Sequence, residues 1–159
     1  MHKTYNRRSI LGYGAAGVAT LAALTSQSQA ATTQYKATLS PASEVPPNTT
    51  TGSGSVTATY DSAAKSLTLN VTYSGLSGPV TAAHIHGPAE AGKNAGVVFW
   101  LSQKPAAQGD TPPPFPSPFS NTVTLTDDQA NDLSSGLYYV NIHTKANPGG
   151  ELRGQLVKS

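Results

Sequence analysis

The stretch Ser66-Leu67-Thr68-Leu69-Asn70-Val71-Thr72-Tyr73 indicates the fold class, because apolar and polar residues alternate strictly along it. Alternation with a period of two is typical of a β-strand that buries one face. A capping box from Thr126 to Gln129 predicts one short helix that ends before Gly136. Shorter strand-like segments lie on both sides of the central stretch, over residues 35–39, 55–60, 81–86, 95–101, 121–125, 137–143 and 151–157. The apolar run at residues 95–101 is expected to be a buried strand. We therefore expect an all-β fold, an antiparallel, Greek-key-like β-sandwich of about eight strands with one short helix, although alternation alone does not exclude hairpin-only connections.

The first thirty residues are expected to be an export signal that is removed from the mature chain. They combine a basic start with a modestly apolar run over residues 10–24 and small residues before the expected cleavage position. The pair Arg7 and Arg8 resembles a twin-arginine motif, while general export remains an alternative. The apolar run is shorter than the ~20 residues of a membrane-spanning helix, so no membrane insertion is expected after cleavage. We expect residues 31–159 to form one domain that is periplasmic or secreted.

A proline-rich stretch over residues 104–118 interrupts the strand pattern. Proline lacks a backbone N–H and fixes φ, so this stretch cannot be a central strand. It is predicted to be a long surface loop, and the sequence leaves open whether that loop is a docking surface.

The composition of the mature chain excludes several kinds of function. Removal of the signal leaves seven basic and eight acidic residues, so the formal net charge is 7 − 8 = −1. There is no basic cluster, so no nucleic-acid partner is expected. The chain has no cysteine, and its one methionine is Met1. A metal site in the mature chain must therefore use histidine, carboxylate, amide, backbone or water ligands.

All three histidines of the mature chain lie in two short strand-like segments. His84 and His86 are two residues apart, so a strand would point both imidazoles to one face, and His143 ends the segment 137–143. If the two strands are neighbours, three neutral imidazoles can bind copper or zinc. Copper is preferred over zinc, because imidazole sites bind Cu(II) more tightly and an exported protein meets copper outside the cytosol. The alternative is structural, since buried imidazoles also form ordinary hydrogen bonds to backbone and side-chain groups.

Three further residues are candidates for a role around this site. Glu44 precedes two prolines that hold the chain extended, and it could accept a hydrogen bond from a histidine N–H. Asn141 shares the expected outer face with His143. Arg153, on the last strand, could guide an anion. The favoured alternative for Glu44 and Arg153 is a salt bridge between loop and strand.

Several ordered blocks of the mature chain resemble the CHRD domain, which is named for chordin and also occurs in bacterial exported proteins. These blocks are Tyr35–Leu39 with Glu44–Pro47, Ser74–Leu76, Ala82–Ala89, Tyr139–Thr144 and Asn147–Leu156. The resemblance implies an all-β domain, and the family pattern falls on Glu44, His84, His86, His143, Asn147, Glu151 and Arg153. The His-x-His strand and the late arginine also faintly resemble copper-zinc superoxide dismutase, but three histidines are too few for its two-metal site.

These observations support three functions, in order of preference. The first is an exported protein that binds copper through His84, His86 and His143 for storage, delivery or protection, with a copper-handling protein as candidate partner. The second is a non-catalytic interaction or matrix module whose histidines are structural. The third is a copper-only, dismutase-like redox enzyme, so a non-enzymatic function is favoured over an enzymatic one.

Overall fold

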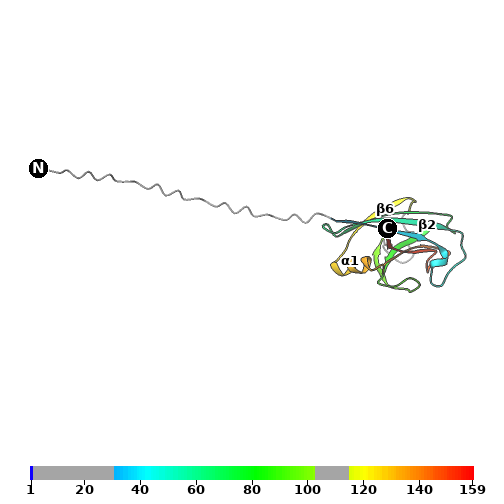
Figure 1. Ribbon diagram of the computed structural model, residues 1–159. Helices are drawn as coiled ribbons and strands as arrows, with labels where there is room; N and C mark the ends of the chain where they lie inside the picture. The colour runs from blue at the N-terminus through cyan, green and yellow to red at the C-terminus, as the bar shows by residue number, and fades with distance from the viewer. Residues whose placement is uncertain (2–30, 103–114) are drawn as a thin grey trace.

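The described part of the chain forms two β-sheets with one short helix (Figure 1). The structure is a computed structural model, and it describes Met1, residues 31–102 and residues 115–159. The remainder of the expected export signal and residues 104–114 of the proline-rich loop lie outside these residues. The elements are β1 (Thr32–Leu39), the 3-10 turn η1 (Pro41–Ser43), β2 (Ser53–Asp61), β3 (Ser66–Ser74), β4 (Val80–His86), β5 (Val97–Trp100), β6 (Phe119–Thr124), α1 (Asp127–Ser134), β7 (Tyr139–Thr144), β8 (Leu152–Gln155) and β9 (Val157–Lys158).

The two sheets are antiparallel and pack as a sandwich. One sheet has the strand order β6-β3-β2-β1-β9, and the other has the order β5-β4-β7-β8. Strand β3 pairs with β6 although β4 and β5 lie between them in sequence, in the other sheet. Strand β4 pairs with its sequential neighbour β5 on one side and with the non-sequential β7 on the other. These non-sequential pairs confirm the expected Greek-key-like β-sandwich.

The core between the sheets forms from the apolar side of each alternating strand. In β3 the buried residues are Leu67, Leu69 and Val71, which are the apolar positions of the alternating stretch. In the other sheet, Ile85 of β4 and Ile142 of β7 contribute fully buried side chains. Burying these alternate residues turns the intervening residues of β4 and β7, including the histidines, to the opposite face of the sheet.

Strand β8 comes close enough to β1 to close one side of the sandwich. Residue Ser40, directly after β1, forms a β-bridge with Arg153 of β8. A Cβ atom at Gly154 would lie 2.3 Å from the carbonyl oxygen of Thr38, so only glycine permits this approach. The close contact fixes the position of β8 beside β7, where Arg153 is paired with Asn141.

The apolar segment at residues 95–101 differs from its expected role. It was expected to be a buried strand, but β5 is an edge strand of only four residues. Its end residues Val97 and Trp100 are 43% and 36% exposed. An apolar run without alternation does not reveal whether a strand has neighbours on both sides, and this one has a neighbour only at β4.

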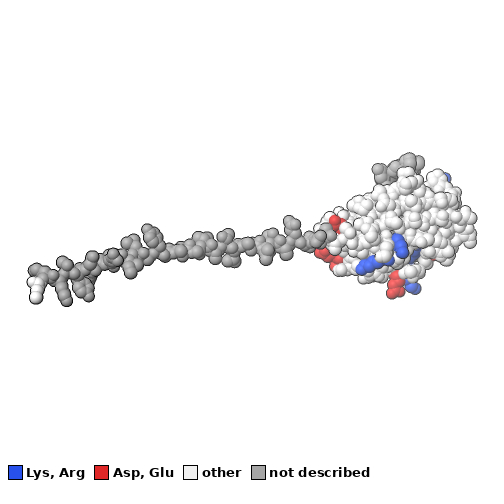
Figure 2. Space-filling model, turned by 45° about the horizontal axis from the view of Figure 1, so that its top comes forward, with Lys and Arg blue, Asp and Glu red and all other residues white. Residues whose placement is uncertain are grey.

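The helix content and the surface charge concern possible contacts of the domain with a membrane or with charged partners. Within residues 31–102 and 115–159, no helix has the length and apolar character needed to cross a membrane. On the face shown in Figure 2, basic and acidic side chains are few and interspersed among uncharged ones.

Candidate metal centre

The structure brings the three histidines together on the outer face of the four-stranded sheet. Strands β4 and β7 are antiparallel neighbours, and the register places His84 opposite Asn141, His86 opposite Tyr139 and His143 opposite Ala82. One ligand nitrogen from each histidine lies within 4.8 Å of those of the other two. The condition that the sequence left open, that the two histidine strands are neighbours, is therefore met.

This outer face is unusually buried for the exterior of a sandwich. His84 is 6% exposed, His86 9% and His143 8%, and all six residues of β7 are buried. The loops after β4 and after β7 contact the histidines through the carbonyl groups of Ala95 and Pro148. The sheet therefore has an apolar core on one face and a covered polar cluster on the other.

Two of the three imidazoles are oriented by backbone carbonyl groups. The Nδ1 atom of His86 lies 2.9 Å from the carbonyl oxygen of Ala95, and Nδ1 of His143 lies 2.9 Å from that of Pro148. A carbonyl oxygen only accepts, so each Nδ1 carries the proton and donates it. In the neutral imidazole the lone pair is then on Nε2. A hydrogen bond that fixes the ring and the tautomer in this way is the usual support of a metal-binding histidine.

The nitrogen atoms left over converge without adequate partners. Nδ1 of His84 lies 3.0 Å from Nε2 of His143, which is hydrogen-bond distance. Nε2 of His84 and Nε2 of His86 are buried and have no hydrogen-bond partner among the described residues. A tetrahedral metal with bonds of about 2.0–2.1 Å holds its nitrogen ligands about 3.4 Å apart, a distance between these 3.0 Å and 4.8 Å values. The group can therefore hold a metal ion after small side-chain rotations.

Aromatic rings pack against the cluster from two sides. The ring of Tyr139 is stacked on that of His86, with centroids 4.9 Å apart and planes inclined by 2°. The ring of Trp100 meets His84 edge-on, with centroids 4.2 Å apart. These contacts restrict the rotation of two imidazoles and reduce access of water to them.

The electrostatics of the site favour neutral imidazoles. Burial, together with the neighbouring His143 and His86, lowers the pKa of His84 to about 4, although a hydrogen bond with Asn141 opposes the shift. Burial also lowers the pKa of His143, against the effect of the Pro148 carbonyl group. Because a metal ion binds the neutral form of imidazole, these histidines are ready to bind at neutral pH.

The sequence matches a known family over most of the described domain. The family model described as the CHRD domain matches residues 35–156. This chain belongs to the CHRD domain family. Comparison with curated proteins and with solved structures finds no match. The histidine strand, the strand of His143 and β8 of this CHRD domain all lie inside the matched range.

Asn141 of the CHRD domain lies beside two of the three histidines. It is 3% exposed, and its Oδ1 atom is 2.9 Å from Nε2 of His143. Its side chain also interacts with His84. The expected position of Asn141 on the outer face with His143 is therefore confirmed.

Arg153 has contacts that tether a loop. Its guanidinium group donates to Oδ1 of Asn94 over 2.8 Å and to the carbonyl oxygen of Lys93, and it lies 3.5 Å above the centroid of the Tyr139 ring. Asn94 in turn donates to the carbonyl oxygen of Val45 over 3.0 Å. Arg153 is only 2% exposed, so these contacts give no support to its expected role as an anion guide.

Glu44 does not accept a hydrogen bond from the imidazole N–H group of His86 or of His143. Those of His86 and His143 donate to backbone carbonyl groups, and Oε1 of Glu44 has no hydrogen-bond partner among the described residues. Among the described residues, Glu44 and Arg153 also do not form the salt bridge that was the alternative. Nevertheless, burial raises the pKa of Glu44 to about 7, against the effects of Arg153 and the Val45 amide.

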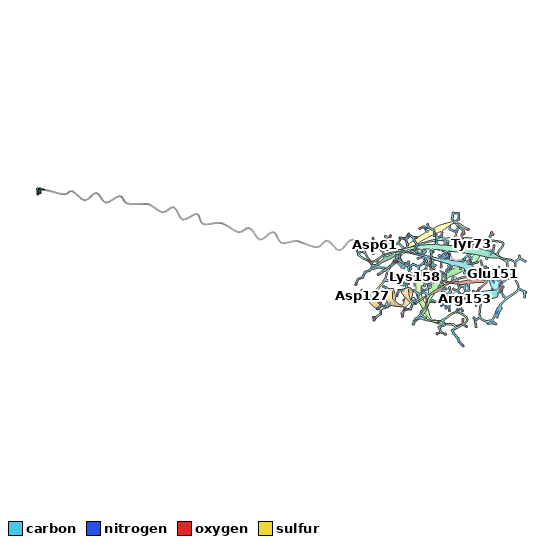
Figure 3. All side chains as sticks on the ribbon, viewed as in Figure 1. Asp61, Tyr73, Asp127, Glu151, Arg153 and Lys158 are labelled. Atoms are coloured by element: carbon cyan, nitrogen blue, oxygen red, sulfur yellow. The ribbon has the colours of Figure 1, made fainter. Side chains whose placement is uncertain are left out.

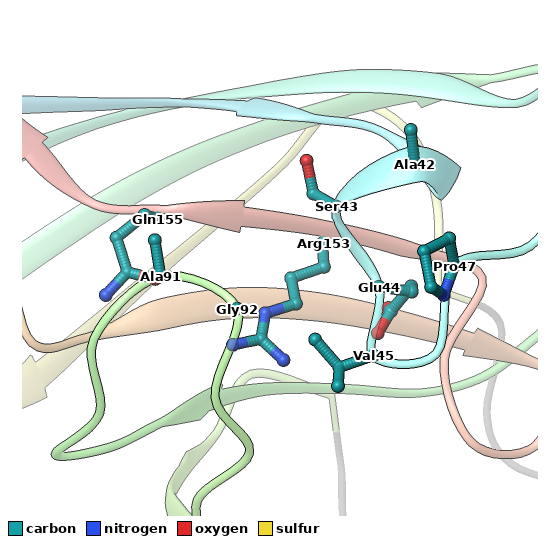
Figure 4. Close-up of a pocket in the computed structure, with 9 residues that line it drawn as sticks. All are labelled: Ala42, Ser43, Glu44, Val45, Pro47, Ala91, Gly92, Arg153 and Gln155. Carbon is teal, nitrogen blue, oxygen red and sulfur yellow. The ribbon is translucent and has the colours of Figure 1, made fainter.

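A pocket of about 440 Å³ lies between Glu44 and Arg153 (Figure 4). It is bounded by the turn η1 with the residues that follow it, by the loop at Ala91, and by β8. A second pocket, on the side of Pro148 and Gly150, also has Glu44 in its wall. Glu44 therefore separates two hollows, one of which borders the residue whose carbonyl group orients His143.

Glu151 supports the loop that carries Pro148. It is fully buried, and its carboxylate accepts hydrogen bonds from Ser77, Thr144 and Asn147. Burial raises the pKa of Glu151, but these hydrogen bonds outweigh that effect and hold the pKa below its usual value. Figure 3 shows Glu151 and Arg153 at the end of the sandwich opposite Asp61 and Asp127.

The backbone carbonyl groups that orient the histidines were not predicted, because no side-chain pattern identifies them.

Proposed function

We propose that this CHRD domain is an exported protein that binds copper through His84, His86 and His143, for storage, delivery or protection. The observation that carries this proposal is the convergence of three buried imidazoles. Nε2 of His84 and of His86 has no hydrogen-bond partner among the described residues, while Nδ1 of His86 and of His143 is bonded to a backbone carbonyl group. Without a ligand, buried lone pairs of this kind cost free energy that a stable fold normally avoids.

Copper is preferred over zinc because of the ligand type and the expected compartment. Imidazole nitrogen binds Cu(II) more tightly than Zn(II) in the order of divalent-ion affinities. An export signal at residues 1–30, as the sequence predicts, would place the domain in a periplasmic or secreted setting. In such a setting a copper-handling protein is a candidate partner for delivery.

The competing function is an interaction or matrix module with structural histidines. The observation in its favour is the 3.0 Å contact between His84 and His143, which satisfies one nitrogen of each ring. This interpretation does not explain the partnerless Nε2 atoms of His84 and His86. The dismutase-like alternative required Arg153 to meet a substrate anion, and the buried contacts of this residue do not favour that role.

The test is the metal content of the full chain after expression with its own signal. We expect near-stoichiometric copper in the wild type and little copper in the variants His84→Ala, His86→Ala and His143→Ala, with circular dichroism showing that each variant is folded. Thr122→Ala, on the outer face of the other sheet, is the control and should retain copper. If the wild type contains no metal and takes up neither Cu(I) nor Cu(II), the copper proposal is wrong and the interaction module is the better account.

A further inference from the structure

The count of hydrogen atoms around Nε2 of His143 reveals an unresolved contact. The Nδ1 atom of this ring must carry the proton, because it faces the carbonyl oxygen of Pro148 at 2.9 Å. In the neutral ring, Nε2 therefore carries only a lone pair. Two atoms face that lone pair: Nδ1 of His84 at 3.0 Å and Oδ1 of Asn141 at 2.9 Å.

Only one of these two contacts can be an ordinary hydrogen bond. Nδ1 of His84 can carry a proton and donate it to His143. The amide oxygen of Asn141 has no proton, so it meets Nε2 of His143 as one acceptor against another. The side chain of His84 is also hydrogen-bonded to Asn141, so one ring N–H has to serve both acceptors. Two acceptors 2.9 Å apart inside a buried site repel each other, and a cation between them would make both of their contacts favourable. Oxygen and nitrogen ligands of one metal ion, with bonds of about 2.0–2.2 Å, are about 3.0–3.5 Å apart.

We propose that the amide oxygen of Asn141 is the fourth ligand of the cation bound by His84, His86 and His143. This inference rests on the proposed function. The fold places Asn141 beside the histidines, since it lies directly opposite His84 in the strand register and is only 3% exposed. Its neighbours Val140 and Ile142 are fixed in the apolar core, so its side chain stays on the histidine side of β7.

The fourth ligand determines which kind of ion the site prefers. A set of three nitrogens and one oxygen suits a divalent ion such as Cu(II) or Zn(II), because amide oxygen is a hard ligand. Cu(I) prefers soft ligands and gains little from an amide oxygen. The site is therefore a site for divalent ions, and a cargo of Cu(I) is disfavoured.

The test compares two variants of the full chain that have almost the same shape at this position. Asn141→Leu removes the oxygen, and Asn141→Asp keeps an oxygen and adds a negative charge. We expect Asn141→Leu to weaken Cu(II) binding by about 10- to 100-fold in chelator competition, with little change for Cu(I). We expect Asn141→Asp to strengthen Cu(II) binding. The Cu(II) electron paramagnetic resonance spectrum should change in both variants, because the coordinated atoms change.

Each outcome separates this inference from the proposed function. If the wild type binds neither Cu(I) nor Cu(II), the proposed function fails first. If it binds Cu(I) but no divalent ion, the proposed function stands and this inference is overturned. If the wild type binds but Asn141→Leu gives the same affinity and the same spectrum, the three-histidine site stands and Asn141 is not a ligand. If Asn141→Leu binds more tightly, the amide N–H faces His143 and competes with the ion, which overturns the inference. Should Asn141→Leu fail to fold, an unchanged spectrum in Asn141→Asp overturns it equally.

Discussion

The surroundings of Glu44 oppose the charge that a carboxylate usually carries. It is 6% exposed, one carboxylate oxygen has no hydrogen-bond partner among the described residues, and its pKa is raised to about 7 by burial. Raising the pKa of an acid in the folded state means that the folded state binds the proton more tightly than the unfolded state does. The resulting stability is present below pH 4.5 and is lost as the pH rises through 7.

We predict that Glu44→Gln removes this pH dependence. The amide cannot ionise, so the stability of the variant relative to the wild type should increase by about 2–3 kcal/mol between pH 4.5 and pH 7.5. The measurement is urea unfolding of both proteins in the presence of a chelator across that range. The histidines titrate in both proteins, so their effects cancel in the difference. A difference that stays constant with pH would show that Glu44 is not buried as described.

For single residues, the sequence predicted which side chains share a face of their strand, but not all of their hydrogen-bond partners. Strand geometry predicted that His84 and His86 share one face of their strand, and that Asn141 and His143 share one face of theirs. The partners of the imidazole N–H groups could not be predicted, because the carbonyl groups of Ala95 and Pro148 belong to loops whose paths depend on tertiary contacts. The sequence proposed Glu44 as such a partner, because it does not show that backbone carbonyl groups already accept these hydrogen bonds.

Among the elements, β8 makes a close backbone contact with the other sheet. Its Gly154 faces β1 so closely that a methyl group there would lie 2.3 Å from a backbone oxygen. Backbone atoms cannot rotate away as a flexible side chain can, so one of the two strands would have to move. The same movement would shift Arg153 and its tether to Asn94.

We predict that Gly154→Ala destabilises the domain by about 2–4 kcal/mol and weakens metal binding. Gly78→Ala is the matched control, since no atom lies within 4 Å of a Cβ at that position. Denaturant unfolding of both variants, followed by metal titration, measures the two effects. Equal stability of the two variants would contradict the close approach of β8 to β1.

The limits of sequence-based prediction also differ among elements. The alternating strand β3 and the capped helix α1 were predictable because each carries its own local signal, a period of two and a capping box. Strand β5 was misjudged as buried because its apolar residues carry no information about neighbours. Edge or central position is a property of the assembled sheet.

For the molecule as a whole, the three histidines and Asn141 form a buried polar cluster on the outer face of the four-stranded sheet. The candidate ligands come from two strands, and two separate loops orient two of them. A metal ion that binds only this arrangement stabilises the folded state through mass action. The unfolded chain would keep the histidines of β4 and β7 apart.

We predict that Cu(II) at 100 times its dissociation constant raises the free energy of unfolding by about 2.7 kcal/mol. Thermal unfolding with and without the ion gives the measurement, and the midpoint should rise by several degrees. The triple variant His84→Ala, His86→Ala and His143→Ala should show no rise. A rise of the same size in that variant would place the ion elsewhere on the protein.

The edge-on contact of Trp100 with His84 has an optical consequence. Trp100 is the one tryptophan of the chain, and its ring centroid lies 4.2 Å from that of His84. Indole emission is quenched efficiently by a paramagnetic ion at such short range, whereas a closed-shell ion leaves it largely intact. The protein therefore carries a built-in fluorophore that distinguishes Cu(II) from Zn(II) at this site without any label.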